Sequence, residues 1–127
     1  MIIDITKLED AQWVEYREGF DLLIRPLSSS KRSEIEKKAT TLVTKFVKGR
    51  RQQVSELDSD KMEELLLDWI IKDWRGLVNP DKNKIACDLA TKLLIFDYFH
   101  DMRRFAIEEA TTIHEKIKEK EENDSKN

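Results

Sequence analysis

The chain is 127 residues long, which is the length of a single domain and excludes most multi-domain enzymes. Charged residues make up 39% of the sequence, yet 23 Lys and Arg against 26 Asp and Glu leave a net charge of -3, too weak a field to steer nucleic acid. With only three Gly and two Pro, the composition favours long helices over a sandwich or barrel of many short strands.

Residues 12–25 carry the clearest β pattern in the sequence. Two extended runs flank Glu18 and Gly19, a spacing typical of a β-hairpin with a two-residue turn. That turn pairs Arg17 with Phe20, Glu15 with Leu22 and Trp13 with Ile24. The hairpin would then present one apolar face that other elements must cover, made of Trp13, Phe20, Leu22 and Ile24.

Helices are predicted for most of the remaining chain. Apolar residues at steps of three and four, Ser caps before the first helix and Gly at two helix ends predict helices at about 29–48, 58–75, 83–95 and 97–119. The last two could be one continuous helix, but we favour a break between Ile95 and Tyr98. The expected fold is mostly α (α+β): an N-terminal β-hairpin and then a small bundle of three or four helices, forming one domain over 1–114. Residues 115–127 are highly charged and are expected to form a disordered tail.

No pattern for catalysis or cofactor binding is present. The sequence lacks a phosphate-binding loop, a dinucleotide-binding motif, a zinc-protease motif and a nucleophile elbow. The single cysteine, Cys87, cannot form an intrachain disulfide or a zinc cluster with His100 and His114. We therefore expect no enzyme activity and no cofactor or metal. The apolar runs are also too short for a membrane span. The single cysteine and the lack of a signal-peptide pattern lead us to expect a location in the reducing cytoplasm.

Charge is unevenly distributed along the chain. Residues 31–51 have a net charge of +6, and residues 56–73 have a net charge of -5. The simpler interpretation is an antiparallel pair of helices whose exposed charges attract weakly. The alternative is a basic partner-binding patch at the end of the first helix, formed by Lys45, Lys48, Arg50 and Arg51.

The order of these elements resembles the tail assembly chaperones of long-tailed bacteriophages and prophages. The resemblance covers roughly residues 12–112 and rests on a hairpin followed by short sequence elements at characteristic spacing. In these chaperones a W-x-G-hydrophobic element closes the second helix, and Trp74, Gly76 and Leu77 match it as a structural signature. The other matching segments are Arg25-Pro26-Leu27-Ser28, Asn83, Asp97-Tyr98-Phe99 and Glu108-Glu109-Ala110.

The resemblance implies a non-enzymatic function in virion assembly. Such chaperones bind the tape-measure protein in the bacterial host cytoplasm and assist assembly of the tail tube, so the implied partners are the tape-measure protein and the tail-tube protein. The resemblance implies no membrane partner, and it is compatible with a homo-oligomer. The alternative is a small cytoplasmic DNA-binding or regulatory adaptor that uses the basic first helix, although the net charge argues against nucleic acid as a partner.

Overall fold

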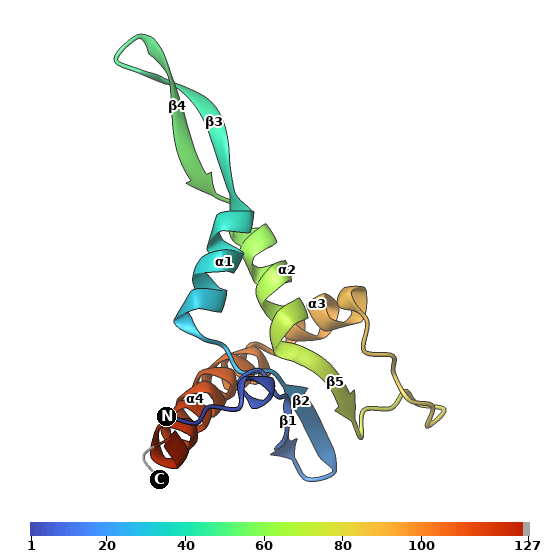
Figure 1. Ribbon diagram of the computed structural model, residues 1–127. Coiled ribbons are helices and arrows are strands. Elements are labelled where there is room, and N and C mark those ends of the chain that lie inside the picture. Colours follow the sequence, from blue (N-terminus) through green and yellow to red (C-terminus); the bar gives the residue numbers. More distant parts are fainter. Residues whose placement is uncertain (126–127) are drawn as a thin grey trace.

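The computed structural model describes residues 1–125, which form an α+β fold with two separate sheets (Figure 1). A short 3-10 helix, η1 (Ile5–Lys7), precedes the first strands. The strands are β1 (Gln12–Arg17), β2 (Phe20–Ile24), β3 (Thr40–Val47), β4 (Arg50–Leu57) and β5 (Ile71–Arg75). The helices are α1 (Ser29–Ala39), α2 (Ser59–Ile70), α3 (Leu89–Tyr98) and α4 (His100–Ser125).

The body of the molecule is built around a three-stranded antiparallel sheet with the order β1-β2-β5. The central strand β2 contributes Leu22 and Ile24, which are completely buried, and α4 packs against β1 and β2. Two alanines, Ala106 and Ala110, are also fully buried, and the Ala110 carbonyl accepts a hydrogen bond from the Leu27 N–H at 3.0 Å. The small side chains at these two positions therefore let α4 approach the segment around Leu27 that follows β2.

The predicted hairpin at 12–25 is confirmed, but its register differs from the prediction. Arg17 does pair with Phe20, whereas an irregularity at Tyr16 shifts the remaining pairs, so that Trp13 faces Leu23. Trp13 consequently keeps 40% of its surface exposed and lies beneath the Arg75 guanidinium, 4.2 Å from the ring centre. The expectation that Trp13 belongs to the buried face was wrong, because the extra residue at Tyr16 moves the side chains on its far side from the turn, Trp13 to Glu15, to the opposite face.

The predicted fold class, a hairpin followed by a bundle of three or four helices, was also wrong. The segment 40–57 forms a second hairpin, β3–β4, in place of the end of the helix expected over 29–48. The helix expected at 58–75 ends at Ile70, after which β5 pairs with β2. The two errors have different causes: the β-branched residues of 40–47 favour extended backbone over helix, whereas β5 forms because β2 offers it a pairing partner far away in the sequence.

Helix starts follow the expected capping chemistry more closely than helix ends. Ser28 caps α1 and Asp58 caps α2, each through a hydrogen bond from a backbone N–H to its side chain. The third helix begins at Leu89 and not near Asn83, because Asp88 is its cap. A break between the last two helices is present, but it lies at Phe99 and not between Ile95 and Tyr98, because α3 continues to Tyr98.

The final helix extends beyond its predicted end at residue 119. Residues 115–125, expected to belong to a disordered tail, continue α4; residues 126 and 127 of that expectation lie outside the described residues. Ile117 packs against the core and Glu121 is 9% exposed, so this part of the helix has a side that is covered.

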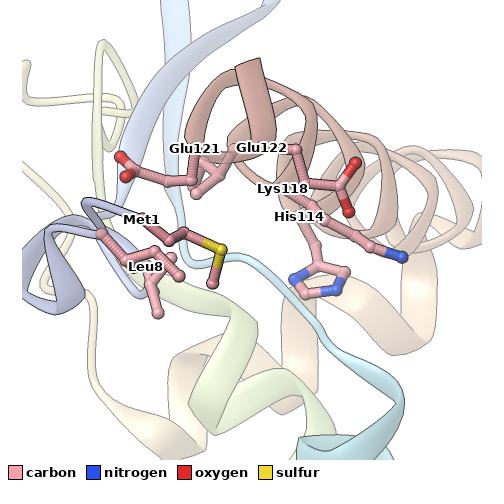
Figure 2. A pocket seen from close by; sticks show the side chains of 8 residues that line it. Met1, Leu8, His114, Lys118, Glu121 and Glu122 are labelled. Atoms are coloured by element: carbon pink, nitrogen blue, oxygen red, sulfur yellow. The ribbon is translucent and has the colours of Figure 1, made fainter. Parts of the chain in front are cut away.

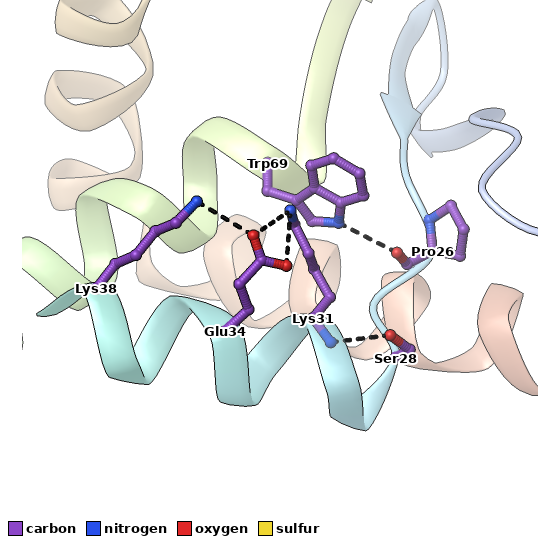
Figure 3. A network of polar contacts seen from close by, with 6 residues as sticks. All are labelled: Pro26, Ser28, Lys31, Glu34, Lys38 and Trp69. Carbon is purple, nitrogen blue, oxygen red and sulfur yellow. Dashed lines mark hydrogen bonds and ion pairs between the residues drawn. The ribbon is translucent and has the colours of Figure 1, made fainter.

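Helices α1 and α2 are held side by side through Trp69, as Figure 3 shows. The Trp69 indole N–H donates to the Pro26 carbonyl at 3.2 Å, and the Lys31 ammonium lies 4.1 Å from the ring centre. Glu34 accepts ion pairs from Lys31 and Lys38, which hold the pKa of the Glu34 carboxyl below its ordinary value, the Lys38 hydrogen bond contributing most. Some of the charged residues of α1 are thus ion-paired with other residues of the same helix.

Candidate partner interface

The β3–β4 hairpin, residues 40–57, stands away from the body, and we call it the β-arm. Figure 1 shows it extending beyond the paired ends of α1 and α2. Its eight cross-strand pairs run without a shift from Thr40 with Leu57 to Val47 with Arg50. The turn between the strands has two residues with positive φ, Lys48 at 52° and Gly49 at 77°, which is the conformation that matches the twist of a two-residue hairpin.

The root of the β-arm is fixed to the body by a single short connection on each side. At this point the Asp58 N–H donates to the Ala39 carbonyl at 2.8 Å, so the end of α1 and the start of α2 are adjacent. The β-arm is therefore an insertion between two helices that are already neighbours. Its two strands receive few packing contacts from the body, and a two-stranded hairpin alone has marginal stability in water.

All four basic residues predicted as a partner-binding patch lie on the β-arm, although on strands and a turn and not at the end of a helix. Lys48 is in the turn, Arg50 and Arg51 follow it, and Lys45 lies across the hairpin. Lys45 is ion-paired with Glu56 at 3.3 Å, and the Arg51 guanidinium lies 5.8 Å from the centre of the Phe46 ring. The structure thus gathers the predicted residues near one tip.

Exposed apolar side chains accompany these charges. Leu42 is 67% exposed, Phe46 73% and Leu57 44%, and strand alternation places the first two on one face of the β-arm. The opposite face carries Val43 and Val54, which face each other and are half-buried. Leu42 and Phe46 lie within 29–48, which was expected to be a helix, so the sequence did not identify them as surface residues of a hairpin.

The acidic segment 56–73 meets the basic segment 31–51 only in part: α1 and α2 lie side by side, and Lys45 pairs with Glu56 within the β-arm, but other acidic groups of α2 pair elsewhere. Glu63 of α2 is ion-paired with Arg103 of α4 at 3.0 Å, and Asp68 with Lys92 of α3 at 3.5 Å. Lys92 keeps only 7% of its side-chain surface exposed. Glu63 and Asp68 are therefore partnered within the body, and Lys48, Arg50 and Arg51 at the tip of the β-arm are exposed.

The three signature residues, Trp74, Gly76 and Leu77, lie in the body and contact other elements of it. Trp74 is completely buried in β5, and its indole N–H donates to the Ile85 carbonyl at 2.8 Å. Gly76 has a φ of 86°, and a Cβ there would overlap the backbone of Gly19 in the first hairpin turn. Leu77 packs against the core and accepts a backbone hydrogen bond from Ile85 at 3.1 Å. Together they join β5, the following loop and the first hairpin.

A second candidate site is an apolar groove between the N-terminal segment and α4 (Figure 2). Its volume is about 480 Å³, and it is lined by Met1, Ile3, Leu8, His114, Ile117, Lys118, Glu121 and Glu122. The Asp4 N–H donates to the Glu121 carboxylate at 3.2 Å and holds the N-terminal segment on the helix. The groove therefore forms between two parts of the same chain, and it brings His114 close to apolar side chains.

The remaining groups of chemical interest are Cys87 and the His, Asp and Glu side chains. Burial raises the pKa of the Cys87 thiol to about 11, which keeps it protonated at neutral pH. No three His, Cys, Asp or Glu side chains among residues 1–125 gather closely enough to hold a metal ion. Within the same residues, no helix has the length and apolar character that crossing a membrane requires.

The sequence did contain a signal for the β-arm. Lys48 and Gly49 form a two-residue turn candidate, preceded by Thr40–Val47 and followed by Arg50–Leu57, and the first of these runs is rich in β-branched residues. The helical spacing of the apolar residues was given more weight than this composition.

Comparison with known proteins gives one family. A family model described as "YdaY prophage protein" matches residues 10–127, which is almost the whole chain. No curated protein and no solved structure matches.

Proposed function

Since the chain belongs to the YdaY prophage protein family, we propose that it is a phage tail assembly chaperone that binds the tape-measure protein and assists assembly of the tail tube in the bacterial host cytoplasm. The proposed function is non-enzymatic and needs no cofactor. The family match supports a prophage protein, and the more specific function is inferred from the resemblance in sequence order and from the exposed β-arm.

The exposed face of the β-arm is the observation that carries this proposal. A folded domain rarely leaves a Phe and a Leu on one face of a hairpin with two thirds or more of their surfaces in water unless that face binds a partner. The face of Leu42 and Phe46 could cover an apolar seam on a long helical partner. A tape-measure chain would present such seams before tube subunits surround it, and covering them would prevent its aggregation.

The basic tip supports reversible binding. Lys48, Arg50 and Arg51 are exposed around the turn, next to the apolar face. Charges at the rim of an interface mainly raise the association rate and make it depend on salt concentration. A chaperone that must release its client during tube assembly would benefit from this combination of a small apolar contact and a screened charge.

Co-expression with the tape-measure protein encoded by the same prophage tests the proposal. We expect the two proteins to co-elute, and we expect the double substitution Leu42→Ser and Phe46→Ser to abolish co-elution. Leu94→Ser and Tyr98→Ser are the matched control, because these residues are 60% and 74% exposed on α3, away from the β-arm, and should leave binding unchanged. Failure of the unmodified protein to bind the tape-measure protein would overturn the proposal.

The shape of the β-arm also favours one second candidate, DNA binding. A two-stranded ribbon has the dimensions to enter the major groove, and here it carries four basic residues. The ribbon takes the place of the basic helix expected from the sequence, since these residues lie on strands and a turn. Fluorescence anisotropy with a labelled duplex at low salt separates the two functions: absence of binding near 50 mM salt excludes the DNA-binding candidate.

A further inference from the structure

Strand β4 has a free edge. Within residues 1–125 it pairs with β3 alone, so along its other side its backbone N–H and C=O groups have no strand to bond. Proteins normally protect such edges with bulges, prolines or inward-pointing charges, because an open edge can pair with another chain. The β3–β4 register has no shift, and 50–57 contains no proline. The edge is therefore regular and open along its full length.

Charges along β4 are arranged asymmetrically. Arg50 and Arg51 lie at the end near the turn, and Glu56 lies at the end near the body, with Asp58 just beyond it. The middle of the strand is uncharged. A parallel neighbour of the same sequence would place like charges together, whereas an antiparallel one would place opposite charges together. Strand β3 has only one charged residue, Lys45, and shows no such arrangement.

We propose that two copies of this chain associate through β4, antiparallel about a two-fold axis at Gln53, so that the two β-arms form one four-stranded sheet. Such an interface is isologous, because the same edge serves both copies. Main-chain hydrogen bonds across the new pair supply its affinity, as in other cases of strand addition. The proposal concerns self-association and holds whichever partner the β-arm face binds.

The register follows from charge and from strand geometry. Residues directly opposite each other must share a face, so a two-fold axis perpendicular to the sheet passes through a residue position and not between two. An axis at Gln53 places Arg50 of each copy opposite Glu56 of the other. The same register brings Lys48 level with Asp58, which caps α2. Both ends of the interface then combine a basic tip with an acidic root.

Pairing of edges leaves the faces of the sheet free. Leu42 and Phe46 of both copies would lie on the same side of the four-stranded sheet, since a two-fold axis perpendicular to a sheet preserves its sides. The dimer therefore presents a doubled apolar face. It also gives each β-arm a second neighbour, and three or more strands are more stable than an isolated hairpin.

Sedimentation velocity of the purified full-length protein over a range of concentrations tests the association itself. We expect a monomer–dimer equilibrium that shifts toward monomer as salt rises, because exposed charge pairs are screened. A protein that stays monomeric at the highest concentration would overturn the proposal. Since no tape-measure protein is present, this result is independent of the chaperone function.

Charge exchange tests the register. We expect Arg50→Glu to raise the dimer dissociation constant by about tenfold or more, because two attractive pairs become repulsive. Arg51→Glu is the matched control, because it makes the same charge change opposite the neutral Ser55 of the second copy and should have a smaller effect. Adding Glu56→Arg to Arg50→Glu should restore the dimer, and failure to restore it would contradict the proposed pairing.

A cysteine at the axis gives a direct test of the contact. In a Cys87→Ser background, Gln53→Cys places two thiols opposite each other with a Cα separation of about 5.5 Å, within the range of a disulfide. Mild oxidation should convert this variant to a covalent dimer. Gln52→Cys is the control, because the two thiols introduced by this substitution would be offset along the strands by two residues. A dimer that cross-links equally through both positions would show that another register or surface is used.

Discussion

Gly76 lies directly against the backbone of Gly19, so closely that a Cβ at Gly76 would overlap the Gly19 carbonyl oxygen. Its φ of 86° is also unfavourable for any residue with a side chain. The end of β5 and the turn of the first hairpin are therefore in backbone contact. This contact explains why position 76 requires Gly, in addition to its place at the end of β5.

The substitution Gly76→Ala should destabilise the protein by about 3 kcal/mol, because it combines left-handed strain with a collision that must displace the hairpin turn. Gly19→Ala is the matched control: its φ is 79°, but a Cβ there meets open space, so strain alone costs about 1 kcal/mol. Urea unfolding of both variants measures the difference. Equal losses would show that the collision has no energetic consequence.

The substitution Trp74→Phe should cost about 2–4 kcal/mol, since it leaves a cavity in the core and deprives the carbonyl of the half-buried Ile85 of its donor. Trp13→Phe, at a half-exposed position of the same sheet, should cost about 1 kcal/mol or less. Chemical unfolding followed by circular dichroism measures both without depending on the fluorescence of the removed indole. A larger loss for Trp13 would contradict the observed register.

Removal of the β-arm should leave the body folded. Replacing residues 41–56 with Asn-Gly joins Thr40 to Leu57 through a two-residue turn, and the hydrogen bond between Asp58 and Ala39 already holds these ends together. We expect a cooperative melt with a midpoint within about 5 °C of the unmodified protein, because the excised residues contribute little to the core. Loss of cooperative unfolding would show that the β-arm supports the body.

The cap of α3 should make stability depend on acid pH. A hydrogen bond from Thr91 holds the pKa of the Asp88 carboxyl below its ordinary value. As pH falls below about 4, the unfolded chain therefore binds the proton first, and the stabilisation present at neutral pH is lost. We expect Asp88→Asn to be less stable than the unmodified protein at pH 7 and the difference to shrink in acid. A difference that is constant from pH 7 to about pH 2 would contradict this assignment.

Local chemistry in the sequence was a good guide to the starts of α1 and α2 and to the turn of the first hairpin, whereas α3 starts at Leu89 and not near Asn83. Ser28 and Asp58 act as caps because their side-chain oxygens accept hydrogen bonds from N–H groups of the first turn, and this depends on residues only three positions away. The pairing of Arg17 with Phe20 depends on an equally local turn.

Longer-range contacts decided the elements that were predicted wrongly. Strand β5 exists because β2 offers it a partner almost fifty residues earlier, and no local pattern shows that pairing. The basic residues Lys45, Lys48, Arg50 and Arg51 were correctly grouped by their closeness in sequence, but the element that carries them was misidentified. Spacing of apolar residues cannot by itself distinguish a helix from a protruding hairpin whose apolar residues face water.

The positions of the three tryptophans have an optical consequence. Trp13, Trp69 and Trp74 all belong to the body, and residues 40–57 contain neither tryptophan nor tyrosine. Intrinsic fluorescence therefore reports only the unfolding of the body, while far-ultraviolet circular dichroism records both parts. A dichroism change that precedes the fluorescence transition during heating would isolate the melting of the β-arm in the unmodified protein, with no label attached.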